Sequence, residues 1–326
     1  MSIVKPGSDA RSDVEIDAQT GVAPVFRALR EAMANKSFET LDAAQRYADQ
    51  FMGQVNVAPQ ADFDGLSAEQ MHALLYFPFD CPQLVDLRLR VPADKVAEAP
   101  LMSLFLLLVQ AIGDQGLKPT ATGNLPRKIC RDIALAYYGE ARYAEQTRFS
   151  AINSELDFFD LHVARLVGEL AGLVRRYKGK FIVSRKGRAL LKAPKSDSLY
   201  PILFRCYAQV FNWAYRDGYP DIPFIQQSFL FTLYLLALHG NSWRRQNFYE
   251  DAYLRAFPMV LTQIPAGGMS DPEHIYRSLY TWRCLKNFAG FTGLADVESV
   301  KKESLAATEF RVRKRPLLGM LVGFPF

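Results

Sequence analysis

Residues 172–188, GLVRRYKGKFIVSRKGR, hold two short runs of apolar and basic residues on either side of Lys178-Gly179. Runs of this length that meet at a glycine are typical of two strands joined by a tight turn, so we expect a β-hairpin here. Ser184 follows the second run, and an Ala-Leu-Leu sequence comes soon after it. A helix is therefore expected directly after the hairpin.

The residues upstream of this hairpin predict three helices and one short strand. Pro100–Gly113 is an apolar run long enough for a helix, and residues 116–125 have the composition of a strand that enters a turn. Arg127–Tyr138 follows a proline and predicts a second helix. Residues 154–173 carry apolar side chains at helical spacing and predict a third. The predicted order is helix, strand, helix, helix, strand, strand.

This order resembles that of the winged helix-turn-helix proteins, and the resemblance covers residues 100–192. It implies that the third helix enters the major groove of DNA while the hairpin, the wing, lies along phosphates or in the minor groove. Residues 117–126, LKPTATGNLP, are also similar to a group of uncharacterised bacterial and plasmid-borne proteins with a Leu-Lys-x-Thr-x-x-Gly-Asn-Leu-Pro element, although Pro119 replaces an apolar residue. This second resemblance implies a bacterial protein associated with mobile elements, and it implies no activity.

The second half of the chain repeats the same order. Helices are predicted over Phe224–His239, over Phe248–Leu261 and from Ser270 to Phe288, and two strands follow. The repeat aligns Gly172 with Gly293, which are 121 positions apart (293 − 172). It also aligns residues 181–186 with residues 310–315, with a longer second wing at 299–308. Chance similarity of two hairpins stays open as the alternative, because such strands are common.

These patterns together predict a mainly α fold with short β-hairpins, of the α+β class. The N-terminal part adds helices at Val25–Ala34 and Thr40–Phe51 and a capping box at residues 67–70. The predicted organisation is a flexible tail at 1–20, an N-terminal helical segment at 21–99, lobe 1 at 100–195, and a helical linker with lobe 2 at 196–326.

Composition excludes several classes of protein. Of the 326 residues, 49% are hydrophobic and 22% are charged, which excludes a disordered chain, a collagen-like chain and a multi-span membrane protein. Residues 222–243 lack formal charge but include three polar side chains in a row, so we expect a buried helix there and no membrane contact. The four cysteines form no CxxC pair, which excludes a zinc ribbon. Residues 1–7 lack the apolar run of a signal peptide, so a cytoplasmic protein is expected.

Charge is distributed unevenly along the chain. Residues 165–192 hold nine basic residues and one acidic residue, and residues 311–315 form a second basic cluster. Basic stripes attract polyanions, although a solvated surface is the plain alternative. We expect both hairpins to present their cationic edges to one anionic ligand. The candidate nucleic-acid contacts are Arg127, Lys128, Arg165, Arg175, Arg176, Lys178, Lys180, Arg185, Lys186, Arg188, Arg277, Arg283, Lys286, Arg311, Arg313, Lys314 and Arg315.

One feature of lobe 1 argues against the reading of DNA sequence. Glu155, Asp157 and Asp160 lie in the first two turns of the predicted third helix, where they suit the helix dipole but would repel phosphate. Only His162 and Arg165 on this helix are placed to reach base edges.

Motifs of common enzymes are missing from the sequence. Neither GxxxxGK[ST] nor GxGxxG, GxSxG or HExxH occurs, so no catalytic residue, metal site or cofactor is predicted. The favoured hypothesis is a non-catalytic protein that binds duplex DNA through its basic wings. Two alternatives stay open: a winged-helix scaffold that binds a protein partner or forms a homodimer, and an enzyme whose site is assembled only by the fold.

Overall fold

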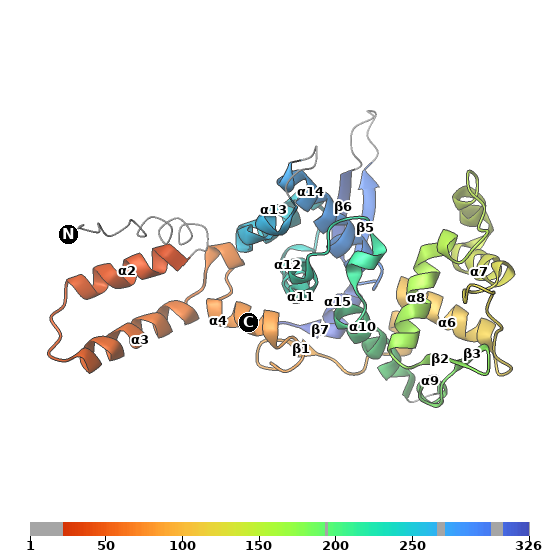
Figure 1. Cartoon of the computed structure of the whole chain (residues 1–326), viewed down its shortest axis with the longest axis horizontal. Helices are drawn as coiled ribbons and strands as arrows, with labels where there is room; N and C mark the ends of the chain where they lie inside the picture. The colour runs from red at the N-terminus through yellow and green to blue at the C-terminus, as the bar shows by residue number, and fades with distance from the viewer. Residues whose placement is uncertain (1–21, 193–194, 266–270, 301–308, 326) are drawn as a thin grey trace, which may run out of the picture.

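The computed structural model describes residues 22–192, 195–265, 271–300 and 309–325. In these ranges the chain is mainly α-helical with small antiparallel sheets, which confirms the predicted fold class. Figure 1 shows an elongated molecule: a pair of helices extends from one end, lobe 2 forms the middle, and lobe 1 lies at the other end. The tail predicted at residues 1–20 lies outside the described residues.

The N-terminal segment packs against lobe 2. Helix α4 (Ala68–Tyr76) begins with the predicted capping box, since the Gln70 N–H donates to Ser67 Oγ and the Ser67 N–H donates to Gln70 Oε1. This helix packs on α12 of lobe 2. The remaining elements of the segment are α2 (Val22–Ala34), α3 (Leu41–Val57), η1 (Ala61–Phe63), β1 (Asp86–Leu87) and α5 (Ala93–Val96).

Lobe 1 has the predicted order of elements. A single bridge between Leu117 and Phe181 takes the place of its first strand. The second helix passes its predicted end at Tyr138 and continues beyond a kink at Gly139, where φ is 71°. The elements are α6 (Pro100–Ile112), α7 (Arg127–Gln146), η2 (Leu156–Phe158), α8 (Phe159–Leu170), β2 (Val174–Tyr177), β3 (Lys180–Val183) and α9 (Arg185–Leu190).

The predicted wing of lobe 1 is a regular hairpin. Strands β2 and β3 pair antiparallel, from Val174 opposite Val183 to Tyr177 opposite Lys180. Both turn residues, Lys178 and Gly179, have positive φ, as a two-residue turn that follows the twist of the strands requires. Ser184 then caps α9, because its Oγ accepts the Gly187 N–H at 2.9 Å.

Lobe 2 follows a helical linker, and one helix predicted in this lobe is divided into two. The apolar run at 224–239 breaks at Ser228, so it forms two helices. In the linker and lobe 2 the elements are η3 (Lys195–Ser198), α10 (Leu199–Gln209), η4 (Trp213–Arg216), α11 (Pro223–Gln227), α12 (Phe229–His239), β4 (Arg244–Arg245), α13 (Gln246–Ala256), η5 (Pro258–Gln263), α14 (Pro272–Tyr280), the π-helix η6 (Thr281–Gly290), β5 (Ala295–Val300), β6 (Glu309–Lys314), α15 (Pro316–Leu321) and β7 (Val322–Gly323). The longer wing predicted at 299–308 lies largely outside the described residues.

The two lobes share the same local geometry where the third helix meets the hairpin. Gly172 and Gly293 both have positive φ, and the residue after each donates to the carbonyl five positions earlier. This arrangement is a Schellman motif, which ends a helix and satisfies its last carbonyls. In both lobes the last strand lies between the other two, because Phe181 bridges Leu117 and Val312 pairs with Arg244.

The predicted alignment of the two hairpins is wrong by two residues. The sequence repeat set Phe181 opposite Phe310, but the pairing partners place Phe181 at the position of Val312. Val183 and Lys314 then correspond, since they pair with Val174 and Ala295 at the start of each hairpin. The register of a strand is set by its pairing partners, and a shift by two keeps alternate side chains on the same face of the sheet.

One hydrophobic cluster runs through both lobes, from Leu66 near α4 to Val322 in the last strand. Helix α12 lies almost entirely inside it. In the described ranges no helix combines the length and apolar character needed to span a membrane. All four cysteines are free thiols.

The paired glycines allow a matched test of this geometry. A Cβ on Gly293 would lie 2.7 Å from the Ala99 Cβ, whereas a Cβ on Gly172 would meet open space. We expect Gly172→Ala to cost about 1 kcal/mol of unfolding free energy through its positive φ alone. Gly293→Ala should cost about 2–3 kcal/mol, because overpacking adds to the same strain. Denaturant unfolding of both variants measures the difference, and equal losses would contradict the crowding at Ala99.

Candidate nucleic-acid interface

Seven basic side chains are exposed on the hairpin of lobe 1 and the start of α9, and we call this set the wing surface. Among the described residues, a carboxylate lies within ion-pair distance of one member, Arg176, whose Nε is 4.0 Å from Glu169. The other six have no carboxylate within ion-pair distance in the part of the chain that the structure describes. The wing surface consists of Arg175, Arg176, Lys178, Lys180, Arg185, Lys186 and Arg188.

Several members of the wing surface are held in place by neutral partners. Lys180 Nζ donates to the Gln115 carbonyl at 3.0 Å, and Lys186 Nζ donates to the Ala171 carbonyl at 2.9 Å. Arg175 and Lys178 lie near the Tyr177 ring, at 5.0 and 5.5 Å from its centroid. These contacts orient the side chains and leave their positive charge available to an external anion.

The three arginines of the second basic cluster are paired with carboxylates of the protein, whereas Lys314 has a neutral partner. Arg311 pairs with Glu298 at 2.7 Å, and Arg313 pairs with Asp296 at 2.9 Å. Arg315 reaches Glu98 at 2.9 Å and also lies 3.6 Å from Asp296. Lys314 donates to the Ala237 carbonyl.

The two hairpins also point in different directions. In Figure 1, β5 and β6 rise at the top of lobe 2, while β2 and β3 lie at the bottom of lobe 1. The prediction that both cationic edges meet one ligand is therefore wrong, because the hairpins lie apart and the arginines of the second are paired with carboxylates.

Two arginines predicted to contact nucleic acid are buried instead. Arg165 donates to Glu155 at 2.6 Å and to Glu169 at 3.0 Å. Arg283 donates from Nε and a terminal nitrogen to the two carboxylate oxygens of Asp217. Each side chain is 2–3% exposed, so neither reaches solvent and both predictions are wrong.

Other predicted contacts have protein partners of their own. Arg277 lies within 3.2 Å of three carboxylates, those of Glu250, Asp251 and Glu273. Lys128 pairs with Asp132 at 2.7 Å, and Arg127 beside it is exposed. Lys286 lies over the ring of Trp282, away from the wing surface.

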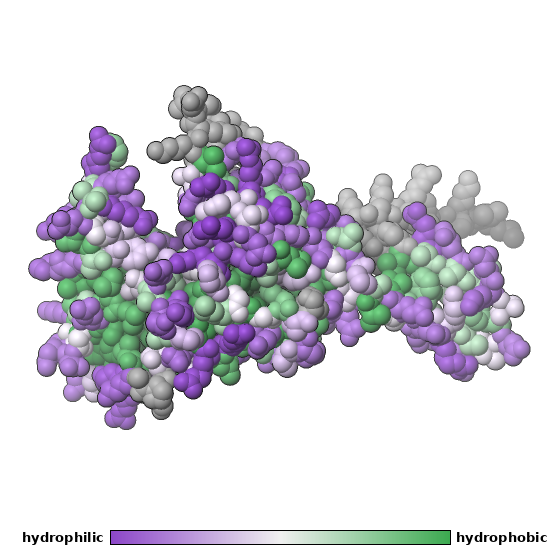
Figure 2. Space-filling model, turned by 180° about the vertical axis from the view of Figure 1, so that it is seen from behind, coloured by the Kyte–Doolittle hydropathy of each residue, from purple (hydrophilic) through white to green (hydrophobic). Residues whose placement is uncertain are grey.

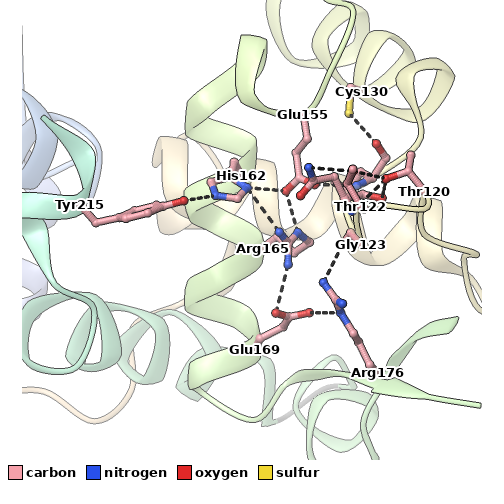
Figure 3. Close-up of polar contacts among 12 residues, drawn as sticks. Thr120, Thr122, Gly123, Cys130, Glu155, His162, Arg165, Glu169, Arg176 and Tyr215 are labelled. Carbon is pink, nitrogen blue, oxygen red and sulfur yellow. Dashed lines mark hydrogen bonds and ion pairs between the residues drawn. The ribbon is translucent and has the colours of Figure 1, made fainter. Parts of the chain in front are cut away.

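A buried polar network supports the wing surface from within lobe 1 (Figure 3). Its centre is Glu155, a carboxylate with no exposed surface. Glu155 accepts the Leu125 N–H at 2.6 Å, lies 2.8 Å from His162 Nδ1 and accepts from Arg165 at 2.6 Å. Burial alone raises the pKa of Glu155, but the His162 hydrogen bond and the Arg165 charge outweigh it and hold the pKa below its ordinary value.

The network continues outward to the wing. Arg165 also binds Glu169, and Glu169 faces Arg176 on β2. Arg176 in turn donates to the Gly123 carbonyl at 2.6 Å, within the loop at 117–126. On the other side His162 Nε2 lies 2.9 Å from the Tyr215 hydroxyl in the linker. The network therefore joins the loop, α8, the wing and the linker.

Sequence reasoning missed the roles of Glu155 and Tyr215. Glu155 was expected to face solvent near a helix start, but Asp157 fills that position and accepts the Asn153 and Ser154 N–H groups. The contact of Tyr215 could not be found from the sequence, because Tyr215 lies 53 residues from its partner His162. The Asn-Leu-Pro part of the loop is the nearest sequence signal, because Glu155 binds the main chain of Leu125.

A family model described as the Y4jL N-terminal domain matches residues 97–196. No curated protein and no solved structure matches the chain. The matched range coincides with lobe 1, so it contains the wing surface and most of the buried network.

The Glu155 network predicts a large and pH-dependent contribution to stability. Glu155→Gln removes the buried counter-charge of Arg165 and leaves it only the partly exposed Glu169, so we expect a loss of about 3 kcal/mol at neutral pH. The pKa of Glu155 is lowered in the folded protein. The difference in unfolding free energy between the wild type and the variant should therefore be largest above pH 4.5, the ordinary pKa of glutamate. It should shrink as the pH falls below that value. Denaturant unfolding across a pH series measures it.

Asp132→Asn is the matched control for this prediction. It removes one carboxylate from an exposed ion pair with Lys128, and such pairs contribute less than about 1 kcal/mol. A Glu155→Gln loss no larger than that of Asp132→Asn would show that the network does not stabilise lobe 1.

Proposed function

We propose that this protein binds duplex DNA without catalysis, through the wing surface of lobe 1. The observation that carries the proposal is the surplus of exposed positive charge on the hairpin and the start of α9, where six of seven side chains have no carboxylate partner in the described residues. Such a surface neutralises phosphates and releases their counterions.

The element order of each lobe supports a winged-helix interpretation. In each, a helix and a first strand precede two further helices, and the first strand pairs with the last. The element at 117–126 supports a place among bacterial, plasmid-borne proteins. The free cysteines suit the reducing conditions of a cytoplasm.

The binding we propose follows the phosphate backbone and does not read bases. Helix α8, which the winged-helix resemblance would place in the major groove, buries Leu161, His162 and Arg165 against the rest of the protein. A helix occupied in this way offers no row of side chains to base edges. Affinity should therefore depend strongly on salt and weakly on DNA sequence.

Removing charge from the wing surface tests this proposal. The double variant Lys178→Gln and Arg185→Gln should lower the affinity for duplex DNA by about tenfold at low salt. It should also reduce the slope of log K against log salt by about 1.8, since each lost phosphate contact contributes about 0.9. Fluorescence anisotropy titrations with two unrelated DNA sequences measure both quantities.

The matched control removes the same charge from the other hairpin. Arg311→Gln with Arg313→Gln alters residues already paired with Glu298 and Asp296, so the affinity should change less than about threefold. Absence of salt-sensitive binding by the wild type, or equal losses in the two double variants, would overturn the proposal.

A second candidate function is self-association through the helices α2 and α3. They extend away from the body of the protein (Figure 1), and α3 contains no buried residue. Leu29, Met33 and Phe38 line a shallow apolar hollow on this pair. A second copy of the pair would complete a four-helix bundle with two-fold symmetry.

Light scattering after size exclusion tests this second candidate. The wild type should form a dimer, and Met33→Asp should be a monomer because it places a charge in the apolar hollow. Leu135→Asp, at a half-exposed position on α7, serves as the control and should remain a dimer. A monomeric wild type at high protein concentration would exclude this candidate.

A further inference from the structure

A cleft separates the end of α7 in lobe 1 from η6 and β5 in lobe 2. Its volume is about 600 Å³, within the usual range for small-molecule sites. Figure 2 shows it as a notch between the upright tip of lobe 1 and the body of lobe 2. None of the wing surface lines this cleft.

One wall of the cleft is an unusual helix. Trp282, Lys286, Asn287 and Gly290 all line it from η6, a π-helix of ten residues. The Phe291 N–H donates to the Lys286 carbonyl, five positions earlier, at 3.0 Å. This spacing brings residues four and five apart onto one side of the helix. π-Helices are rare in proteins, and those that do occur often lie at functional sites.

The carboxylates of the cleft are already paired with arginines. Asp160 binds Arg216, and Glu98 binds Arg315. Asp296 lies 3.6 Å from the same Arg315, and Glu298 binds Arg311 at 2.7 Å. Each acidic group therefore has an arginine partner, which reduces its effect on the remaining cations.

Two cations of the cleft have no carboxylate partner among the described residues. Arg142 lies over the Tyr138 ring, and Lys286 Nζ lies 3.6 Å from the centroid of Trp282. Burial lowers the pKa of Lys286, although the nearby Asp160 acts in the opposite direction. A half-buried ammonium group that lies over aromatic rings can donate hydrogen bonds to an anionic oxygen.

The same wall offers groups that suit a flat heterocycle. Trp282 keeps 40% of its surface exposed, and Tyr137 lies among the other residues of the cleft. The Asn287 carbonyl is used by Tyr207 and Arg216, but within the described residues its side-chain amide has no hydrogen-bond partner. An amide provides both a donor and an acceptor, which matches the edge of a nucleobase.

We propose that this cleft binds a mononucleotide. Lys286 and Arg142 hold its phosphate, the exposed surface of Trp282 stacks on its base, and the Asn287 amide binds the base edge. The site is separate from the wing surface and does not depend on DNA binding.

Titration calorimetry on the full chain tests the site with adenosine 5′-monophosphate, adenosine and inorganic phosphate as probes. The nucleotide should bind at least about tenfold more tightly than either part alone, because only the nucleotide engages both sets of groups. Lys286→Met keeps an apolar side chain of similar length, and Arg142→Ala changes an exposed residue, so both variants should fold. Each should weaken nucleotide binding by about tenfold or more.

Two controls separate this site from the wing surface. Lys95→Ala removes an exposed lysine paired with Asp94 and should bind the nucleotide like the wild type. The wing variant Lys178→Gln with Arg185→Gln should also keep nucleotide binding, and Lys286→Met should keep DNA binding. The proposal is overturned if no nucleotide binding is detected near about 1 mM, if phosphate alone binds as tightly, or if neither cleft variant differs from the wild type.

Discussion

The buried carboxylate of Glu155 is the constraint on which lobe 1 depends. A buried charge is costly unless it is paired and fully hydrogen-bonded, and three groups from two parts of the chain meet this requirement. Leu125 brings the 117–126 loop, while His162 and Arg165 turn one face of α8 inward. Helix α8, which occupies the place of a recognition helix, is therefore mostly buried. The exposed basic side chains of lobe 1 lie instead on its hairpin and the start of α9.

The two lobes show how one topology can carry different surface chemistry. Both end their third helix at a glycine with positive φ, and both place the last strand between the other two. The arginines of the second hairpin nevertheless find acidic partners on the neighbouring strand, as Arg311 and Arg313 do with Glu298 and Asp296. Cross-strand pairs of this kind hold the sheet together, whereas on the first hairpin only Arg176 lies within ion-pair distance of a carboxylate of the described residues.

The sequence was informative where structure is decided locally. The capping box at Ser67, the turn at Lys178-Gly179 and the Schellman glycines depend on residues within a few positions of one another. Burial of Arg165 and Arg283 could not be predicted in this way, because periodicity identifies one side of a helix but not what covers it. Asp217 lies 66 residues from Arg283, and no spacing links the two. The strand alignment failed for a related reason, since register depends on pairing partners.

The cleft between the lobes is lined by two helices that depart from regular geometry, α7 and η6. Before Gly139, helix α7 buries Cys130, Ile133 and Ala134 in the core. Beyond this glycine, whose φ of 71° interrupts the helical path, α7 is largely exposed, although Tyr143 still packs against the core, and it carries Arg142 to the cleft. On the opposite wall, the π-helical stretch keeps Leu285 and Phe288 buried while it turns Lys286 and Asn287 outward. Two departures from regular helix geometry, in elements that are far apart in the sequence, thus place Arg142 and Lys286 on two walls of one cleft, where neither has a carboxylate partner among the described residues.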